Sequence, residues 1–292
     1  MLAHVPVLLD EVVEMLSPRN GGVYFDGTFG GGGYTRSILE SAKCTVVGCD
    51  RDQRVLCAAN ELREKYGNNF KFSHAKFSDV EQILKNYAIA KLDGIVLDLG
   101  VSNFQLNDPS RGFSFRHSGP LSMEMGLCRK SAMDIIHEYS EQQLADIIYE
   151  YGEERFSRKI AKNIKKNLEK IKNTEDFANI IRICVKKTGR TDPATKTFQA
   201  IRICVNEELV ELKAILDLLP ILLNPGGRVV VVSFHSLEDR IIKTHFKQLC
   251  DDKNCADHRF CLLTKKPLIP SRSEVLANPK SRSAKLRGIC KV

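Results

Sequence analysis

A glycine-rich segment near the start of the chain constrains the fold more than any other feature. Residues 23–34 spell VYFDGTFGGGGY: a short β-prone run ends at Asp26, four glycines follow from Gly30 to Gly33, and a helical pattern begins near Thr35. A strand, a glycine-rich turn and a helix in this order bring backbone N–H groups and a helix N-terminus to one place, where a nucleotide-like ligand can approach closely. Glycines also collect in turns for conformational reasons alone, so the run by itself leaves ligand binding open.

A second strand pattern with a terminal acid favours the ligand-binding interpretation. Residues 45–49 (TVVGC) are typical of a buried strand and are followed by Asp50, twenty residues after Gly30. An acidic side chain at that tip suits the two hydroxyls of a ribose. The order D-G-T-F-G-G-G differs from the G-x-G-x-x-G fingerprint of dinucleotide-binding oxidoreductases. It resembles the first motif of class I S-adenosylmethionine-dependent methyltransferases, and an oxidoreductase is the weaker alternative.

The first hundred residues alternate between strand and helix patterns. Strands are predicted at 23–25, 45–49, 70–73 and 92–100, and helices at 4–16, 35–41, 54–66 and 80–86. This alternation predicts an α/β fold, a doubly wound parallel sheet with ligands at the carboxyl ends of its strands. Asp26, Asp50 and Asp98 all fall at such ends. Phe77 lies in the loop after the third strand, where it could stack on an adenine ring or serve as a core side chain.

The region after Asp98 has a different character. A loop of little periodicity occupies 101–125, and such long loops inside compact domains are usually functional. Helical patterns then follow one another at 135–137, 140–151, 155–171, 174–187 and 195–219. Since successive helices without strands do not fit between two strands of one sheet, we predict an inserted all-helical domain at 108–217, flanked by a sheet domain made of 1–107 and 218–292. A strand at 226–234, a helix at 238–250 and strands near Leu262 and Leu286 would complete that sheet.

The basic residues are concentrated in two segments. The net charge is +8, but residues 151–190 hold twelve Lys and Arg against five Asp and Glu, and residues 265–292 hold eight against one. A solvated helix face would explain the first segment, yet two segments of one sign favour a polyanion partner, above all nucleic acid. In the first segment four cations recur at spacings of three and four, which predicts one helix face that contacts RNA phosphates. They are Arg158, Lys162, Lys165 and Lys166.

Two further features bear on location and metals. No apolar run approaches the roughly 18 residues that span a bilayer, and the N-terminal stretch contains acids, unlike a signal peptide, so a cytoplasmic protein without membrane contact is expected. Cys250, Cys255, His258 and Cys261 give the spacing C-x4-C-x2-H-x2-C. This is not a standard zinc-finger spacing, so no metal is predicted, although a structural zinc site stays an alternative.

Eight ordered sequence blocks point to one known family. They are HVPVLLDEV, DGTFGGGGYTRSIL, DLGVSNFQL, RGFSF, GEERFSRKIA, DPATKTFQAIRICVNEEL, VVSFHSLEDRI and NPKSRSAKLR. Across essentially its whole length the chain resembles the RsmH (MraW) family of 16S rRNA (cytosine(1402)-N4)-methyltransferases. The resemblance implies a class I, Rossmann-like methyltransferase core with S-adenosylmethionine as cofactor. It also implies that 16S rRNA or the small ribosomal subunit is the partner, with the helical insert recognising RNA.

The resemblance also implies a cofactor site. The matching positions are Gly32, Gly33, Tyr34, Asp50, Phe77, Asp98 and Gln105. Tyr34 departs from the pattern, because the family often has His there, and a hydrogen bond from that ring nitrogen must then be made by a phenol or lost.

The catalytic candidates lie after the fourth and fifth predicted strands. Amino-methyltransferases commonly carry a D/N/S-P-P-Y/F/W motif after the fourth strand, where this chain has DLGVSNF, with polar acceptors and an aromatic ring but no prolines. We predict that Asp98 orients the cofactor and could accept the amine proton, with Asn103 and Phe104 near the base. His235 is a further catalytic candidate, but the same segment also suits a helix start with Ser236 as N-cap.

The main alternative from another class is a non-catalytic RNA-binding or ribosome-assembly factor that retains a cofactor pocket. The sequence leaves open whether the substrate is naked RNA or an assembled subunit, and whether the protein is a monomer or a homodimer.

Overall fold

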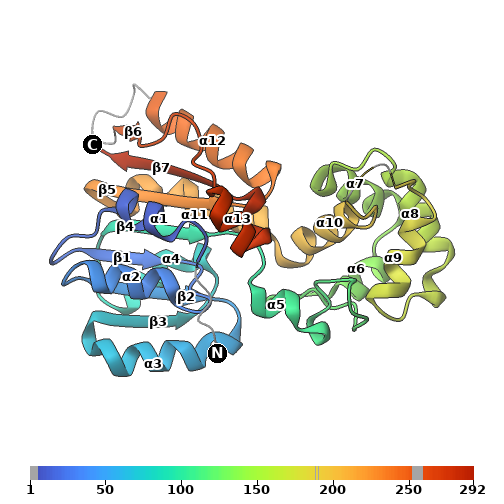
Figure 1. The fold of residues 1–292 in the computed structure, drawn as a ribbon, viewed down its shortest axis with the longest axis horizontal. Coiled ribbons are helices and arrows are strands. Elements are labelled where there is room, and N and C mark those ends of the chain that lie inside the picture. The colour runs from blue at the N-terminus through green and yellow to red at the C-terminus, as the bar shows by residue number, and fades with distance from the viewer. Residues whose placement is uncertain (1–5, 188, 190, 252–258) are drawn as a thin grey trace. The chain divides into compact units, whose positions relative to one another are not determined.

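The computed structural model describes residues 6–187, 189, 191–251 and 259–292 (Figure 1). The chain divides into two compact units: residues 1–100 with 209–292, and residues 101–208. We call them the sheet unit and the helical unit. The functional domain limits expected from the sequence, 107/108 and 217/218, stay a prediction.

The sheet unit contains a seven-stranded sheet in the order β3-β2-β1-β4-β5-β7-β6. Its strands are β1 (Val23–Asp26), β2 (Thr45–Asp50), β3 (Phe70–His74), β4 (Leu92–Asp98), β5 (Leu223–Ser233), β6 (Phe260–Leu262) and β7 (Lys285–Lys291). Strands β1 to β5 pair in parallel, whereas β7 runs antiparallel to both β5 and β6. The chain reverses its direction of travel through the sheet between β1 and β4, so a ligand crevice is expected at the carboxyl ends of these two strands.

Helices cover both faces of this sheet. They are α1 (Leu9–Leu16), α2 (Gly33–Ser41), α3 (Leu56–Tyr66), α4 (Val80–Asn86), α11 (Glu208–Leu222), α12 (Ser236–Asp251) and α13 (Arg272–Ala277). On β5, Val230 and Val232 join the core formed with α1, α2 and α3, whereas Val229 and Val231 join the core formed with α4, α11 and α12. Because successive strand side chains point to opposite faces, a strand buried on both sides is a continuous apolar run. The prediction of a doubly wound α/β sheet is confirmed.

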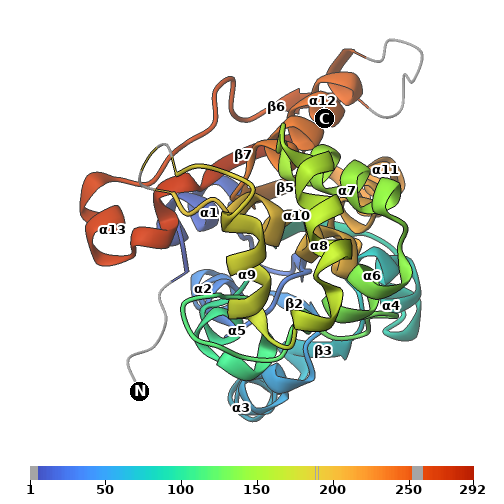
Figure 2. The same cartoon turned by 90° about the vertical axis from the view of Figure 1, so that its right-hand side faces the viewer.

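The helical unit contains α5 (Asn103–Asn107), α6 (Ala132–Glu138), α7 (Glu141–Gly152), α8 (Ser157–Lys166), α9 (Thr174–Arg182) and α10 (Thr195–Asn206). The described part of residues 101–208 contains no strand. Figure 2 shows α7 and α8 next to each other, in agreement with their extensive contacts. Ser102, Ser131 and Ser140 begin α5, α6 and α7 with capping boxes, in which a serine and a residue three positions later bond each other's backbone N–H. The loop predicted at 101–125 therefore includes one short helix.

The long helix predicted at 195–219 is in fact two helices. The break falls at Glu207, whose backbone adopts the left-handed conformation with φ 54°. Before it, the fully buried Asn206 amide accepts a hydrogen bond from the Met125 N–H and donates to the Met123 carbonyl. These distant partners fix the end of α10, and an apolar periodicity carries no information about them. Likewise, the helices predicted at 155–171 and 174–187 end earlier, at Lys166 and Arg182.

At the N-terminus, α1 begins at Leu9, after Leu8 in the left-handed conformation. The start of the helix predicted at 4–16 lies outside the described residues. Among the residues that are described, no helix has both the length and the apolar character needed to cross a membrane.

Candidate cofactor and active site

A buried carboxyl group holds the turn after β1. Asp26 is 0% exposed, and its two carboxyl oxygens accept hydrogen bonds from the Thr28 N–H (3.3 Å) and from the Thr35 hydroxyl (2.7 Å). Burial raises the pKa of Asp26 to about 6, against these two hydrogen bonds, which lower it. The Thr28 hydroxyl in turn accepts the backbone N–H of Asp98 at 2.6 Å. Asp26 and Thr28 thereby tie the ends of β1 and β4 together at the sheet's switch point.

Three glycines after β1 each have a local structural reason to be glycine. Gly30 has φ +52°, and its N–H donates to Asp50 Oδ2 at 2.8 Å. Gly32 has φ +73°, and an added Cβ would lie 2.5 Å from a methyl carbon of Leu62. At Gly33 an added Cβ would lie 2.3 Å from Pro6. Close packing therefore demands glycine at both predicted cofactor positions, 32 and 33, and it brings the turn and the first residue of α2 against the fold.

Asp50 stands at the end of β2, as predicted. Its Oδ2 accepts the Gly30 N–H and its Oδ1 accepts the Asp52 N–H, each at 2.8 Å. Burial raises the pKa of Asp50, while those two backbone hydrogen bonds lower it. Because a carboxylate offers about four acceptor positions, two hydrogen bonds leave capacity for the hydroxyls of a ribose. Asp50 also fixes the turn between β1 and α2, residues 27–32, which we call the glycine turn. Sequence spacing alone does not show this contact.

Asp98, at the end of β4, has an unsatisfied oxygen. Its Oδ1 is buried and has no hydrogen-bond partner among the described residues. Burial raises the pKa of Asp98 well above its usual value, and the nearby Asp26 and Glu238 carboxyls raise it further. A buried acceptor without a donor is costly. The group that fits it is a ligand that donates N–H or carries positive charge, and S-adenosylmethionine does both.

Phe77 packs against Gly27, and Tyr34 is the second residue of α2. Phe77 begins a short 3-10 turn after β3, is partly buried, and lies so close to Gly27 that an added Cβ there would be 3.0 Å from the Phe77 Cβ. Tyr34 is 3% exposed, and its hydroxyl donates to the Val7 carbonyl. Burial raises the pKa of Tyr34 well above its usual value, so the phenol keeps its proton. Direct contact of either ring with the cofactor stays a prediction.

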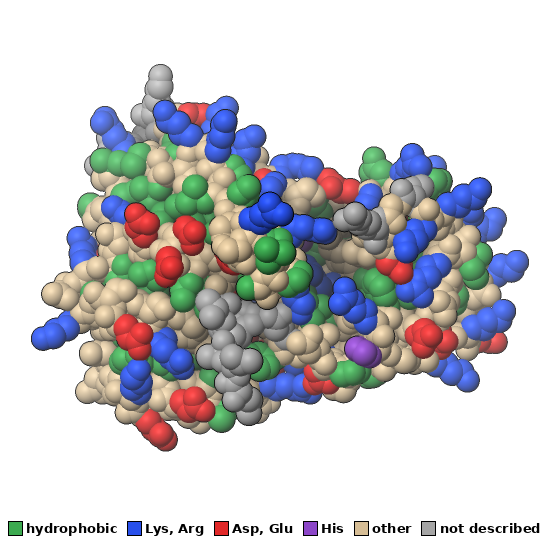
Figure 3. Space-filling model, viewed as in Figure 1, with side chains coloured by type: hydrophobic (Ala, Val, Ile, Leu, Met, Phe, Trp, Pro, Cys, Tyr) green, Lys and Arg blue, Asp and Glu red, His purple; other side chains and the backbone are tan. Residues whose placement is uncertain are grey.

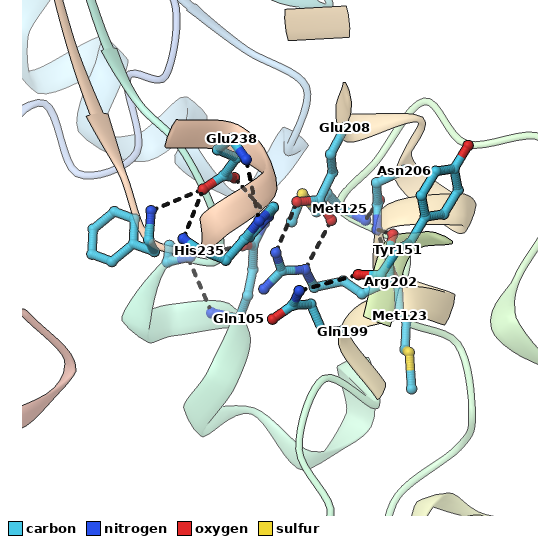
Figure 4. Close-up of polar contacts among 12 residues, drawn as sticks. Gln105, Met123, Met125, Tyr151, Gln199, Arg202, Asn206, Glu208, His235 and Glu238 are labelled. Atoms are coloured by element: carbon cyan, nitrogen blue, oxygen red, sulfur yellow. Dashed lines mark hydrogen bonds and ion pairs between the residues drawn. The ribbon is translucent and has the colours of Figure 1, made fainter. Parts of the chain in front are cut away.

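His235 begins the helix that follows β5. Figure 4 shows it beside Glu238, whose Oε2 accepts the Phe234 N–H (2.8 Å) and the His235 N–H (3.3 Å). The His235 Nδ1 faces the Glu238 N–H at 3.4 Å, and its Nε2 lies 3.2 Å from Glu238 Oε1. His235 therefore occupies the N-cap position and Glu238 the third helical position. The prediction of Ser236 as N-cap is wrong, because Ser236 is already the first residue of α12.

The predicted residues of the helical unit lie on its first helix. Asn103 is the first residue of α5, and Phe104 beside it is 66% exposed. Gln105 is buried, and its Oε1 accepts the Ser102 N–H at 3.0 Å as part of the capping box. The described structure thus accounts for Gln105 as a capping residue, and a role at the cofactor stays a prediction. Figure 4 also shows an ion pair within this unit, in which the Arg202 guanidinium binds both oxygens of Glu208.

Two members of the cysteine and histidine cluster, Cys255 and His258, lie outside the described residues. Of the other two, Cys250 is partly buried near the end of α12 and Cys261 is exposed on β6.

Sequence reasoning did not single out Thr28 and Thr35 as site residues. Both hydroxyls are needed because Asp26 and Asp98 end neighbouring strands with buried polar groups. Of these contacts Asp26–Thr28 alone is local, and the Thr28 backbone N–H makes it rather than the hydroxyl, so the sequence carries no signal for the two hydroxyl contacts.

The sheet order, the glycine turn and the acids that end β1, β2 and β4 define a class I S-adenosylmethionine-dependent methyltransferase. The strand directions agree with this class, since β7 alone among the described strands runs opposite to the other strands of the sheet. The sequence model of the MraW methylase family matches residues 1–292. The chain belongs to the MraW methylase family.

Curated relatives agree with this membership over nearly the whole chain. Ribosomal RNA small subunit methyltransferase H of Ehrlichia chaffeensis is 48% identical over 301 residues, which cover 99% of this chain and 100% of the relative. The protein of the same name from Ehrlichia ruminantium (strain Gardel) is 47% identical over 299 residues, with 99% of each chain covered. The one from Acidiphilium cryptum is 46% identical over 305 residues, covering 99% of this chain and 97% of the relative.

Proposed function

We propose that this protein transfers a methyl group from S-adenosylmethionine to the exocyclic amine, N4, of a cytidine in the 16S ribosomal RNA of the small subunit. The observation that carries the proposal is the buried, unsatisfied Oδ1 of Asp98 at the carboxyl end of β4, beside the glycine turn. The names of the relatives, which are ribosomal RNA small subunit methyltransferases, support RNA as the substrate. A ribosomal substrate would be met in the cytoplasm.

The chemistry explains why an acceptor is needed. The lone pair of the cytosine amine is delocalised into the ring, so the nitrogen attacks only when an acceptor draws on its N–H and pyramidalises it. S-adenosylmethionine, when bound, supplies an electrophilic methyl group on a positively charged sulfur. Asp98 suits the acceptor role, because a nearby positive charge favours the ionised form of a carboxyl group whose pKa is otherwise raised.

The other predicted residues would bind and orient the cofactor and the target base. Asp50 would hold the ribose hydroxyls and Phe77 would stack on the adenine. The backbone of Gly32, Gly33 and Tyr34 would line the amino-acid end of the cofactor. Gln105 would complete the cofactor site, and Asn103 and His235 would act near the base.

The helical unit supports an RNA partner. Figure 3 shows Lys and Arg side chains over the face that carries α8 and α9. On α8, Arg158, Lys162 and Lys166 are exposed at spacings of four, so they form one row of positive charge. Lys165 was predicted on the same phosphate-contacting face, but its ammonium instead donates to the carbonyls of Ile136 (2.8 Å) and His137 (2.9 Å) in the last turn of α6. The predicted face therefore has three members.

Methyl transfer to defined substrates tests the proposal. Purified protein and methyl-labelled S-adenosylmethionine would be incubated with small subunits, or with naked 16S rRNA, from a strain that lacks this family's enzyme. We expect labelled N4-methylcytidine in one of the two substrates, and no label in subunits from a strain with an active enzyme, because their cytidine already carries the methyl group. Cofactor binding without methyl transfer to either substrate would favour the binding-factor alternative.

A further inference from the structure

A buried carboxylate outside the predicted site reaches the loop that carries Phe77. Glu211 lies in the first turn of α11 and is 7% exposed. Its Oε1 accepts a hydrogen bond from the Lys76 ammonium at 2.9 Å, and its Oε2 accepts one from the Ser78 hydroxyl. Both oxygens of one carboxylate are thus committed to the two residues that flank Phe77.

The same loop is held at its other end by β2. The Ala75 N–H donates to the backbone carbonyl of Asp50 at 3.1 Å, and the Asp79 N–H donates to the Lys76 carbonyl at 3.0 Å. The loop from 75 to 79 is therefore fixed between the end of β2 and the start of α11. Phe77, at its centre, lies against Gly27 of the glycine turn.

Packing of α11 does not require this charge. The helix is anchored by Leu212, Ile215, Leu216 and Leu219, each 0% exposed. Burying a carboxylate is unfavourable unless it is paired and hydrogen-bonded, and an apolar residue of similar volume would often be at least as stable. The Lys76–Glu211 pair, with side chains 21% and 8% exposed, is thus better explained by the geometry it imposes than by the stability it adds.

We propose that Glu211 is a positioning residue that holds Phe77 in the orientation in which its ring stacks on the adenine of the cofactor. The inference rests on the proposed function insofar as it places Phe77 in the cofactor site. Glu211 acts through Lys76 and Ser78 and touches no reacting atom. An aromatic ring on a restrained loop loses less conformational freedom when it stacks than one on a free loop, so affinity rises without a new contact.

A double-mutant cycle tests this role. The affinity for S-adenosylhomocysteine would be measured by calorimetry for wild type, Glu211→Ala, Phe77→Ala and the double variant. Since the Glu211 effect passes through the ring, Glu211→Ala should weaken binding about tenfold in wild type and less than twofold in the Phe77→Ala background. Ser78→Ala, a milder change that keeps the ion pair, should show the same pattern with a smaller effect. Glu81→Gln, which removes an exposed charge from α4, is the matched control and should leave affinity unchanged.

Three outcomes would overturn the inference. Equal losses of affinity with and without the Phe77 ring would mean that Glu211 supports the whole fold. Unchanged affinity in folded Glu211→Ala and Ser78→Ala proteins would mean that the carboxylate positions nothing. Unchanged affinity in Phe77→Ala would remove the ring from the site, yet methyl transfer by that variant would leave the proposed function standing.

Discussion

Asp26 and Asp98 are carboxyl groups that the fold buries at the ends of neighbouring strands. Each has a pKa raised above its usual value, mainly because burial disfavours the charged form. Their hydrogen bonding differs. Asp26 accepts hydrogen bonds from two donors of the protein, whereas Asp98 Oδ1 accepts none from the described residues. Asp26 is thus suited to stabilising the turn after β1, and Asp98 is suited to binding a ligand.

The pKa of Asp26 predicts a pH dependence of stability. A carboxyl group whose pKa is raised from 3.8 to about 6 on folding contributes stability that is fully present below about pH 4 and is lost as the pH rises through 6. A shift of two units corresponds to about 3 kcal/mol. Asp26→Asn cannot ionise, so its Tm relative to wild type should be higher at pH 7.5 than at pH 4.5. Equal Tm differences at the two pH values would contradict the raised pKa.

Asp50 should contribute strongly to cofactor affinity. Its carboxylate fixes Gly30 and, in the proposal, also accepts two ribose hydroxyls, and hydrogen bonds to charged groups contribute about 1.5 to 3 kcal/mol each. Asp50→Ala should weaken S-adenosylhomocysteine binding at least tenfold by calorimetry. Glu61→Ala, at an exposed position of α3, is the control. Wild-type affinity in folded Asp50→Ala would remove Asp50 from the site.

Substitutions at the end of β4 and in the loop after it distinguish a catalytic role from a binding role. If Asn103 acts on the amine mainly in the transition state, Asn103→Ala should lower kcat more than it raises KM, whereas Asp98→Ala should impair both. Methyl incorporation at saturating cofactor measures the difference. An Asn103→Ala rate within twofold of wild type would end its catalytic role.

At the scale of elements, α8 combines two uses of positive charge. The partly buried Lys165 caps the end of α6, while Arg158, Lys162 and Lys166 are exposed. If these three contact phosphates, replacing them with Gln should reduce the salt dependence of RNA binding by about one unit of log–log slope per lost contact. Lys165→Gln serves as the matched control, expected to lower Tm without changing that slope. An unchanged slope in the triple variant would make the row an ordinary solvated face.

The elements differ in how far the sequence predicts them. Strands β1 to β5, and the acids that end β1, β2 and β4, follow from apolar runs and their terminating residues, which are local signals. The break at Glu207, the N-cap at His235 and the cap from Lys165 depend on partners far away in sequence or on side-chain geometry, and periodicity contains neither. For the same reason the site acids were predicted but their hydrogen bonds to Thr28, Thr35 and Gly30 were not.

At the scale of the whole molecule, the chain joins two units with different chemistry. The sheet unit contains the glycine turn and the strand-end acids, and the helical unit contains the basic row of α8. The helical unit, residues 101–208, interrupts the sheet unit after β4; two residues separate it from Asp98 and two from Glu211. The chain thus enters the insert shortly after a proposed cofactor-site residue and leaves it shortly before the residue proposed to position Phe77.

The central claim is that this protein methylates a small-subunit cytidine at N4 and that Asp98 is required. The direct test is mass spectrometry of nucleosides from 16S rRNA of a deletion strain that expresses either wild type or Asp98→Asn at equal levels. Wild type should restore N4-methylcytidine, and Asp98→Asn, an uncharged near-isostere, should restore less than a tenth of it. N4-methylcytidine at wild-type levels in the Asp98→Asn strain, or its absence in the strain with wild type, would contradict the account.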